Sequence, residues 1–361
     1  MSIKTASARS CIVRNRVCGP TVLVHFRARE RTRLSWKYLF PFMLTLVVPS
    51  ALPAAAASHT IASEQDNSSN YTLRVNANLV VMNATVVNRH NVLVSGLVQD
   101  DFQIYENHIL QPIRHFSHED LPVTVGLVID NSGSMRPKRD DVIAASMSFA
   151  NSSNPQDQIF VVNFNEHVTY GLPEILPFTD QRMQLQRALS TINTTGETAL
   201  YDAIAVALDH LKQGKCDKKV LIIISDGGDN ASKHSLAQIS GMAKASDAII
   251  YTIGVFDAQD GDQNPEVLKR FAKDTGGEAF FPQSSKEVAT ICEGIARDIR
   301  NQYTLAYVPT ISKSDGGFRT VEVKVTSTGH GHLSVRTRTG YSVPPEVLPL
   351  EPGSVGHDTR Q

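Results

Sequence analysis

Cysteine is scarce in this sequence of 361 residues, which contains four in all. Cys11 and Cys18 lie in a basic N-terminal stretch, so the rest of the chain can form at most one disulfide, between Cys216 and Cys292. An exported protein can oxidise such a pair. However, Cys216 falls in a polar loop and Cys292 in an expected helix, and disulfide geometry is restrictive. Buried or free thiols are the alternative.

The sequence also lacks a comfortable membrane span. The apolar run Tyr38–Val48 is interrupted by Pro41, whereas a helix that crosses a bilayer needs roughly 20 apolar residues. The run follows a basic region and precedes the small residues Ala54–Ala57, which is the order found in secretory signals. We therefore expect residues 1–57 to be a signal peptide, and the protein to be exported to the periplasm, the cell envelope or the medium. An uncleaved N-terminal anchor is the alternative, and only then would the protein be attached to a membrane.

Several motifs of catalysis and nucleotide binding are absent. There is no Gly-x-x-x-x-Gly-Lys phosphate loop and no Gly-x-Ser-x-Gly nucleophile elbow. A serine-dependent hydrolase needs a base beside its nucleophile, and the serines considered below have no His near them in the sequence. We therefore expect a protein that is not an enzyme, without catalytic residues and without residues for an organic cofactor.

Positive charge is scarce outside the N-terminus. The first 57 residues hold nine of the 35 Lys and Arg and one of the 36 Asp and Glu, which leaves a net charge of −9 on the remainder. An acidic body argues against nucleic acid as a partner.

Hydrophobic periodicity predicts a two-part architecture. Residues 71–120 contain short alternating runs with turn signals, which indicate a small antiparallel sheet. Residues 121–301 alternate apolar strands with amphipathic helices, which predicts an α/β fold with a doubly wound, mostly parallel sheet. Residues 302–343 alternate again, and we expect them to complete the first sheet, so that the α/β unit is inserted in a split β domain. Residues 58–70 and 344–361 have the composition of a disordered linker and tail. The strands expected in the first β segment are Leu79–Val87, Val92–Leu97, Phe102–Tyr105 and Ile109–Phe116.

The stretch from Val123 to Ser134 lies at the centre of the expected α/β unit. Its apolar half, Val123–Ile129, suits a strand buried on both faces, and the Asp-Asn-Ser-Gly-Ser that follows has the composition of a loop. Asp130, Ser132 and Ser134 therefore lie at the carboxyl end of a central strand, where open α/β sheets bind their ligands.

Two further polar loops are expected at the same rim. Asp226 directly follows the apolar strand Val220–Ile224, and Thr198 stands at the start of the expected helix Ala199–Leu211. The carboxyl ends of parallel strands share one edge, so oxygen-bearing side chains from three segments converge there. An all-oxygen donor set suits Mg²⁺, Ca²⁺ or Mn²⁺ and is poor for zinc or copper. The candidate metal ligands are Asp130, Ser132, Ser134, Thr198 and Asp226.

These motifs resemble the von Willebrand factor type A domain and its metal-ion-dependent adhesion site. The matching pieces are Asp-x-Ser-x-Ser at residues 130–134, Thr198 in Thr-Ala-Leu-Tyr-Asp-Ala-Ile, and Asp226 in Ile-Ser-Asp-Gly-Gly-Asp. The resemblance covers about residues 121–300. The flanks, with Asp-Phe-Gln-Ile-Tyr-Glu at residues 101–106 and Gln-Tyr-Thr-Leu-Ala-Tyr at residues 302–307, look like those of a group of bacterial exported proteins, a likeness that names no activity.

The resemblance implies a role for each of the five residues. Ser132 and Ser134 would ligate the ion directly, Thr198 and Asp226 directly or through water, and Asp130 would orient the site. In the family, an acidic side chain of a partner protein takes the remaining position. This agrees with the preference of Mg²⁺ for six oxygens at about 2.1 Å. We expect a protein-binding module for adhesion or assembly. A structural envelope protein stabilised by the ion is one alternative, and a hydrolase whose His is distant in the sequence is the other.

Three polar residues beside the site are not counted as ligands. Asn131 is expected on the opposite side of the turn, and Asp229 is expected to cap a loop or helix. Glu197 is expected to face solvent and to complement the dipole of the following helix. The alternative for Glu197 is that its charge adds to the site and favours Ca²⁺.

Overall fold

The computed structural model describes residues 79–343 except 192, 257–262 and 311–316. The expected signal peptide (1–57), linker (58–70) and tail (344–361) lie outside the described residues. Among the helices within the described ranges, none is both long enough and apolar enough to cross a membrane.

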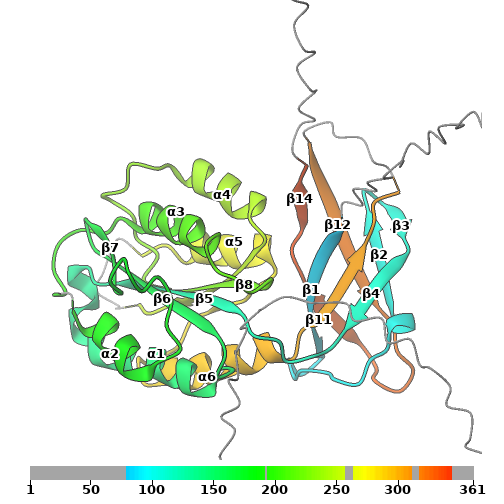
Figure 1. Cartoon of the computed structure of the whole chain (residues 1–361), viewed down its shortest axis with the longest axis horizontal. Coiled ribbons are helices and arrows are strands. Elements are labelled where there is room, and N and C mark those ends of the chain that lie inside the picture. Colours follow the sequence, from blue (N-terminus) through cyan, green and yellow to red (C-terminus); the bar gives the residue numbers. More distant parts are fainter. Residues whose placement is uncertain (1–78, 192, 257–262, 311–316, 344–361) are drawn as a thin grey trace, which may run out of the picture. The chain divides into compact units, whose positions relative to one another are not determined.

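An α/β domain is built around a six-stranded sheet with the order β10-β9-β8-β5-β6-β7 (Figure 1). Neighbouring strands from β10 to β6 pair in parallel, and β7 pairs antiparallel with β6. Every residue of β5 is buried, because the sheet is covered on both faces. The expected α/β fold with a mostly parallel sheet is therefore confirmed. The strands are β5 (Thr124–Asp130), β6 (Gln158–Phe164), β7 (Val168–Tyr170), β8 (Lys219–Ser225), β9 (Ala248–Gly254) and β10 (Ala279–Phe280).

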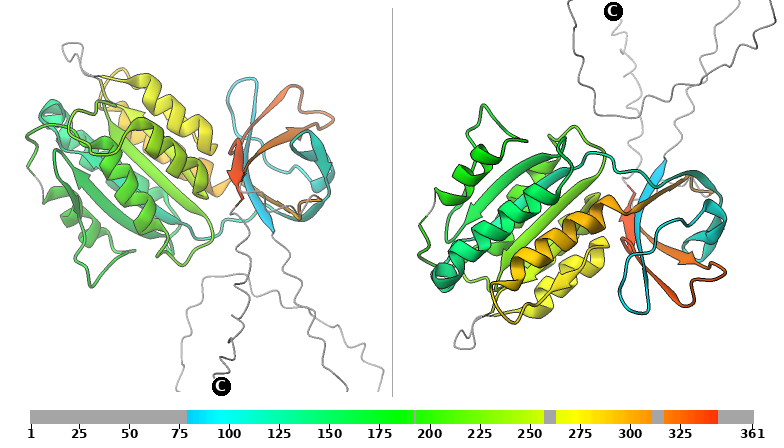
Figure 2. Two further views of the ribbon diagram at one scale, coloured as in Figure 1. Left: turned by 90° about the horizontal axis from the view of Figure 1, so that it is seen from above. Right: turned by 90° about the horizontal axis from the view of Figure 1, so that it is seen from below.

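Six helices of this domain cover the two faces of the sheet (Figures 1 and 2). One face carries α1 (Arg139–Ser152), α2 (Arg182–Ser190) and α6 (Glu287–Arg300), and the other carries α3 (Leu200–Leu211), α4 (Leu236–Ala245) and α5 (Pro265–Thr275). A short 3₁₀ helix, η2 (Gly133–Lys138), connects β5 to α1. Local sequence sets the ends of these helices: the Asn264 side chain accepts a hydrogen bond from the Val267 amide at the start of α5, where Pro265 needs no donor of its own.

The strands that precede the α/β domain in the sequence pair in antiparallel fashion with the strands that follow it. β1 (Val80–Asn88) lies between β11 (Tyr303–Tyr307) and β13 (Leu333–Arg336), and β2 (Phe102–Glu106) pairs with β12 (Phe318–Val325). The insertion of the α/β unit between two halves of a β domain was predicted, and these pairings agree with it. The β domain has two four-stranded sheets, however, with the orders β13-β1-β11-β4 and β14-β12-β2-β3, where one sheet was expected.

Three details of the β domain differ from the expected strands. Pro112 has no amide hydrogen to donate, and the expected strand Ile109–Phe116 divides there into β3 (Ile109–Gln111) and β4 (Ile113–Ser117), which belong to different sheets. Val92–Leu97 forms only an isolated bridge from Leu93, since the Asn88 side chain accepts the amides of His90 and Val92 in a tight turn. A short 3₁₀ helix, η1 (Gln99–Asp101), and a last strand, β14 (Gly340–Ser342), were not expected.

The two cysteines of the described chain are not joined. Cys216 and Cys292 are both buried without a disulfide, so the alternative of buried thiols is the correct one. Burial raises the pKa of the Cys292 thiol to about 12.

Candidate metal centre

The candidate site begins where β5 and β8 end side by side. Ile129 is the register partner of Ile224, so Asp130 and Ser225, the next residues, are neighbours across the two strands. The Ser225 hydroxyl donates to Asp130 Oδ2 at 2.6 Å. Sequence reasoning missed Ser225, although a hydroxyl residue that ends an apolar run directly before Asp226 was an available signal.

The Asp130 carboxylate holds its own loop in place. Asp130 Oδ1 accepts the Ser132 amide at 2.8 Å, and Oδ2 accepts the Ser225 hydroxyl. The residue is 2% exposed. Both of its oxygens therefore bind groups of the chain itself, and Asp130 acts as an anchor for the polar loop that follows β5.

Two serines of that loop reach the loop that follows β8. The Ser132 and Ser134 hydroxyl oxygens lie 3.1 Å apart, and the Ser134 hydroxyl donates to Asp226 Oδ2 at 2.6 Å. Asp226 Oδ1 accepts the Gly228 amide at 3.1 Å. The structure thus brings Ser132, Ser134 and Asp226 together, although 92 positions separate Ser134 from Asp226.

The loop that carries Thr198 is bound to both of the others. The Thr198 amide donates to Asn230 Oδ1 at 2.8 Å, and its carbonyl accepts the Asn230 amide at 3.0 Å. On the other side, the Gly133 amide donates to the Gly196 carbonyl at 3.1 Å. Thr198 is 7% exposed. Asn230 was missed, because nothing in its sequence context distinguishes it from other loop residues.

A glycine allows the Asp226 loop to turn at this point. Gly227 has φ +81°, which side chains rarely adopt, and a Cβ there would lie 2.5 Å from the Asn264 carbonyl oxygen. The Asn264 amide in turn donates to the Asp226 carbonyl at 3.1 Å. The start of α5 therefore fixes the loop in which Asp226 lies.

The two carboxylates of the site, Asp130 and Asp226, have no positively charged side chain paired with them in the described chain. Burial, and then the charge of Asp226, raise the pKa of Asp130 to about 6, against the effect of the hydrogen bonds from Ser225 and Ser132. Within the described ranges, no Lys or Arg forms an ion pair with Asp130 or Asp226. Nor do three or more His, Cys, Asp or Glu gather anywhere in the described chain in a metal-binding arrangement. Two carboxylates with neighbouring hydroxyls form a donor set that fits a hard dication.

Of the three residues that were not counted as ligands, two bind groups of the chain itself and the third is exposed. The Asn131 side chain donates to the Ile129 carbonyl and to Asn163, within the buried sheet end. Asp229 Oδ1 accepts the Tyr201 amide and the Ser232 hydroxyl, so it caps the first turn of α3. Glu197 is exposed, as predicted.

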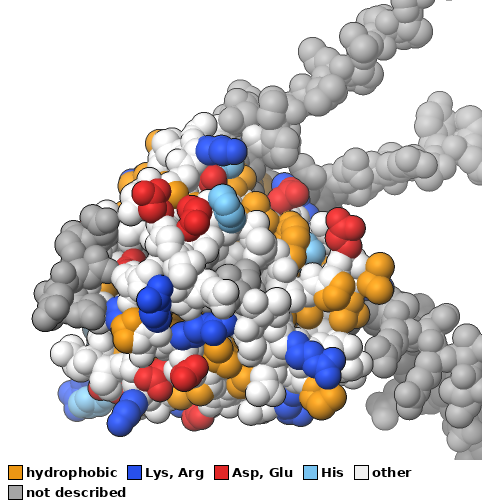
Figure 3. Space-filling model, turned by 90° about the vertical axis from the view of Figure 1, so that its left-hand side faces the viewer, with side chains coloured by type: hydrophobic (Ala, Val, Ile, Leu, Met, Phe, Trp, Pro, Cys, Tyr) orange, Lys and Arg blue, Asp and Glu red, His pale blue; other side chains and the backbone are white. Residues whose placement is uncertain are grey.

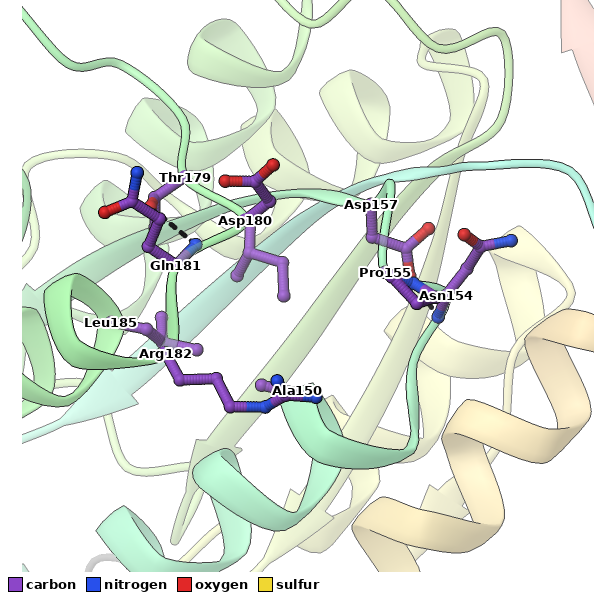
Figure 4. Close-up of a pocket in the computed structure, with 10 residues that line it drawn as sticks. Ala150, Asn154, Pro155, Asp157, Thr179, Asp180, Gln181, Arg182 and Leu185 are labelled. Carbon is purple, nitrogen blue, oxygen red and sulfur yellow. Dashed lines mark hydrogen bonds between the residues drawn. The ribbon is translucent and has the colours of Figure 1, made fainter.

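A small cavity lies at the opposite rim, before β6 (Figure 4). It has a volume of ≈ 60 Å³ and is lined by Asp157, Asn154 and Arg182, among others. Burial raises the pKa of Asp157 to about 6, while its carboxylate accepts the amides of Val123 and Asn154. Asp157 therefore binds the backbone just before β5 and the loop after α1, which fixes both segments at this rim.

Residues 125–228 match the family described as the von Willebrand factor type A domain. The matched stretch begins in β5, ends two residues after Asp226 and includes all five candidate ligands. Over this stretch the α/β domain is therefore similar to the von Willebrand factor type A domain. The match covers less than a third of the chain, so it concerns this domain and not the whole protein.

Several known proteins are similar to part of the chain. An uncharacterised protein of Borreliella burgdorferi is 21% identical over 179 residues, which are 48% of this chain and 51% of that protein. The chain thus spans about half the length of this curated relative. A von Willebrand factor type A structure from Catenulispora acidiphila is 13% identical, with a TM-score of 0.45, and 74% of each chain is covered. The corresponding domain of the type V pili tip protein Mfa5 from Porphyromonas gingivalis is 15% identical, with a TM-score of 0.42, over 49% of this chain and 95% of that one.

Proposed function

We propose that this protein is an exported, non-enzymatic module that binds a partner protein through a divalent cation. The ion is Mg²⁺, Ca²⁺ or Mn²⁺, held by Ser132, Ser134, Thr198 and Asp226 and oriented by Asp130. The partner presents a carboxylate, and the role is adhesion or assembly at the cell envelope or beyond it. The basic, then apolar leader supports export, and the acidic body argues against nucleic acid.

One observation carries the proposal. Ser134 meets Asp226 at 2.6 Å, beside the buried Asp130, and within the described chain neither carboxylate has a Lys or Arg in an ion pair. Burying carboxylates without a counter-charge is costly. A bound dication would supply that counter-charge and, being short of ligands, would accept a carboxylate from outside.

The residues of the chain prepare this arrangement. Asp130 uses both oxygens to hold the loop of Ser132 and the end of β8. Asn230 holds the backbone of Thr198 beside the Asp226 loop. The two serine hydroxyls and the Asp226 carboxylate are joined by hydrogen bonds without an ion, and the Thr198 backbone is fixed near them. This supports the proposal, because groups that are ordered beforehand lower the cost of binding.

Metal titration of matched variants tests the site. Asp226→Asn removes a proposed ligand, whereas Asp229→Asn makes the same change three positions later, at a helix cap. We expect Asp226→Asn to weaken Mg²⁺ binding by at least about 100-fold, and Asp229→Asn to leave it within a few-fold, by isothermal titration calorimetry. Equal affinities of wild type and Asp226→Asn would reject the site.

A pull-down from cell-envelope extract separates adhesion from a purely structural ion. Wild-type protein with Mg²⁺ is compared with the same protein in EDTA and with Asp130→Ala. A partner retained only in the first case supports the proposed function. Loss of thermal stability in EDTA with no Mg²⁺-dependent partner would favour the structural alternative.

A further inference from the structure

A second feature lies on the same rim as the candidate metal centre. An open pocket of ≈ 430 Å³ is bounded on one side by η2 and the start of α1 and on the other by the segment 193–195. The Thr195 amide donates to the Asn131 carbonyl at 3.0 Å, so the loops of the metal centre also form the pocket walls. Figure 3 views this side of the molecule, on which Lys and Arg side chains lie among uncharged groups and several Asp and Glu side chains. The lining residues are Arg136, Pro137, Arg139, Asp140, Asn193, Thr194 and Thr195.

The Arg136 side chain is held in place by a hydrogen bond from its Nε atom. Its Nε donates to the Thr194 carbonyl at 3.1 Å, across the pocket wall. Arg136 is exposed and lies two residues after Ser134. Among the described residues, no carboxylate forms an ion pair with it. A guanidinium fixed through Nε keeps its two outer nitrogens for another acceptor, and this fork matches a carboxylate.

The pocket carries a net positive charge and an unused donor. Arg139 also reaches this wall, where its Nη2 donates to the Ser190 carbonyl at 2.9 Å. Asp140 is the only acid among the lining residues. Thr194 is 6% exposed, and within the described chain its hydroxyl has no hydrogen-bond partner. Two arginines and a hydroxyl against one carboxylate favour an anionic ligand.

We propose that this pocket binds a second acidic side chain of the partner whose first acidic side chain completes the metal ion. The inference rests on the proposed function and narrows it: the partner presents an acidic segment with two carboxylates, one for the ion and one for Arg136. A metal ion alone would accept a carboxylate from any partner. The positive charge of Arg136 beside the ion favours partners that carry a second acidic side chain, and this provides selectivity.

Blocked glycine peptides provide the probe. One peptide carries a single Asp, and the others carry a second Asp at successive positions after it. Binding is followed by NMR titration of the ¹⁵N-labelled protein, with Mg²⁺ and in EDTA. The variants are Arg136→Gln and Arg182→Gln. Arg182 is the matched control, because its Nε also donates to an oxygen, that of Asn151, but it lies at the opposite rim.

With Mg²⁺, we expect one spacing of the two acids to bind wild type about three- to fivefold more tightly than the single-acid peptide. The gain should vanish in Arg136→Gln and persist in Arg182→Gln, with shifts of the Thr194 and Thr195 amides only for the two-acid peptide. Equal affinity for all peptides, or an equal loss of affinity in both variants, would reject the proposed role of the pocket. Neither result would contradict the metal-dependent function. Binding that ignores Mg²⁺ altogether would instead reject the proposed function, and the pocket's role with it.

Discussion

Asp130 and Asp298 are buried carboxyls in the same domain, and burial raises the pKa of each to about 6. Their charged neighbours have opposite signs. Asp226 acts on Asp130 and raises its pKa further, whereas Lys218 lowers the pKa of Asp298 and Arg336 lies 2.8 Å from it. Burial alone therefore does not distinguish the two carboxyls. The difference is the cation that the chain itself provides beside Asp298.

Glu106 in the β domain repeats the pattern of Asp298. It is 4% exposed, and its Oε1 lies 2.9 Å from Arg319 Nη1. Its other oxygen accepts the hydroxyls of Tyr307 and Tyr341. The chain thus supplies an arginine where a buried carboxylate is structural. At the rim of the parallel sheet, within the described residues, it supplies hydroxyls instead, which is the arrangement expected for a cation that comes from solution.

The largest effect is expected from removing an internal cation. Arg319→Met leaves Glu106 buried without its counter-charge, so the free energy of unfolding should fall by about 3–5 kcal/mol. Urea denaturation followed by circular dichroism measures this loss. Lys324→Met on the same strand is the control, because Lys324 and its partner Glu322 are 52% and 59% exposed and such pairs contribute at most about 1 kcal/mol. Similar losses in both variants would show that the buried cation has no special weight.

The pH dependence of stability should reverse when the ion is added. In EDTA the folded protein holds a proton on Asp130 up to about pH 6, whereas the unfolded chain loses it near 3.8. The folded state then binds more protons in this window, so this group's contribution is full below pH 3.8 and is lost as pH rises through 6, by about 3 kcal/mol. With saturating Mg²⁺ the carboxylate is the favoured form, and the contribution should rise with pH instead.

Denaturation midpoints from pH 4 to 7, with and without Mg²⁺, check this reversal. Other buried acids add their own slopes, so the relevant quantity is the difference between the two conditions. Asp130→Asn should remove that difference. A difference that survives in Asp130→Asn would assign the ion to another place in the protein.

Much of the fold could be read from the sequence, because the α/β domain follows its hydrophobic pattern. Helix α3 begins one residue after the predicted start and ends at the predicted Leu211, and β5 and β8 shift by only one residue at their ends. The β domain was harder to predict, since its strands pair across the whole inserted domain. Pro112 could have indicated the corner between β3 and β4, but alternation alone does not tell one bent strand from two.

The same contrast holds for the site. Asp130 and Asp226 could be placed at one rim because each follows a buried parallel strand. Two residues that hold the site in place were not predicted. The Ser225 hydroxyl donates to Asp130 on the neighbouring strand, and the Asn230 side chain accepts the Thr198 amide. Such contacts depend on loop conformation, which composition does not fix. The pocket at Arg136 was not predicted for the same reason, as its second wall comes from a segment about 60 residues away in sequence.

The smallest effect is expected from removing one buried negative charge in the metal-free protein, where the direction of the stability change is the test. Asp226→Asn ends the repulsion with Asp130 and keeps an oxygen for the Gly228 amide, while the Ser134 hydroxyl can accept from the new side-chain amide instead of donating, so stability in EDTA should rise by about 1 kcal/mol. Asp298→Asn should instead lower stability by about 1–3 kcal/mol, because it breaks the pair with Arg336. Urea denaturation of both variants in EDTA tests the contrast. If both changes destabilised the protein, the rim carboxylates would be satisfied without an ion, and the reason for placing a cation there would disappear.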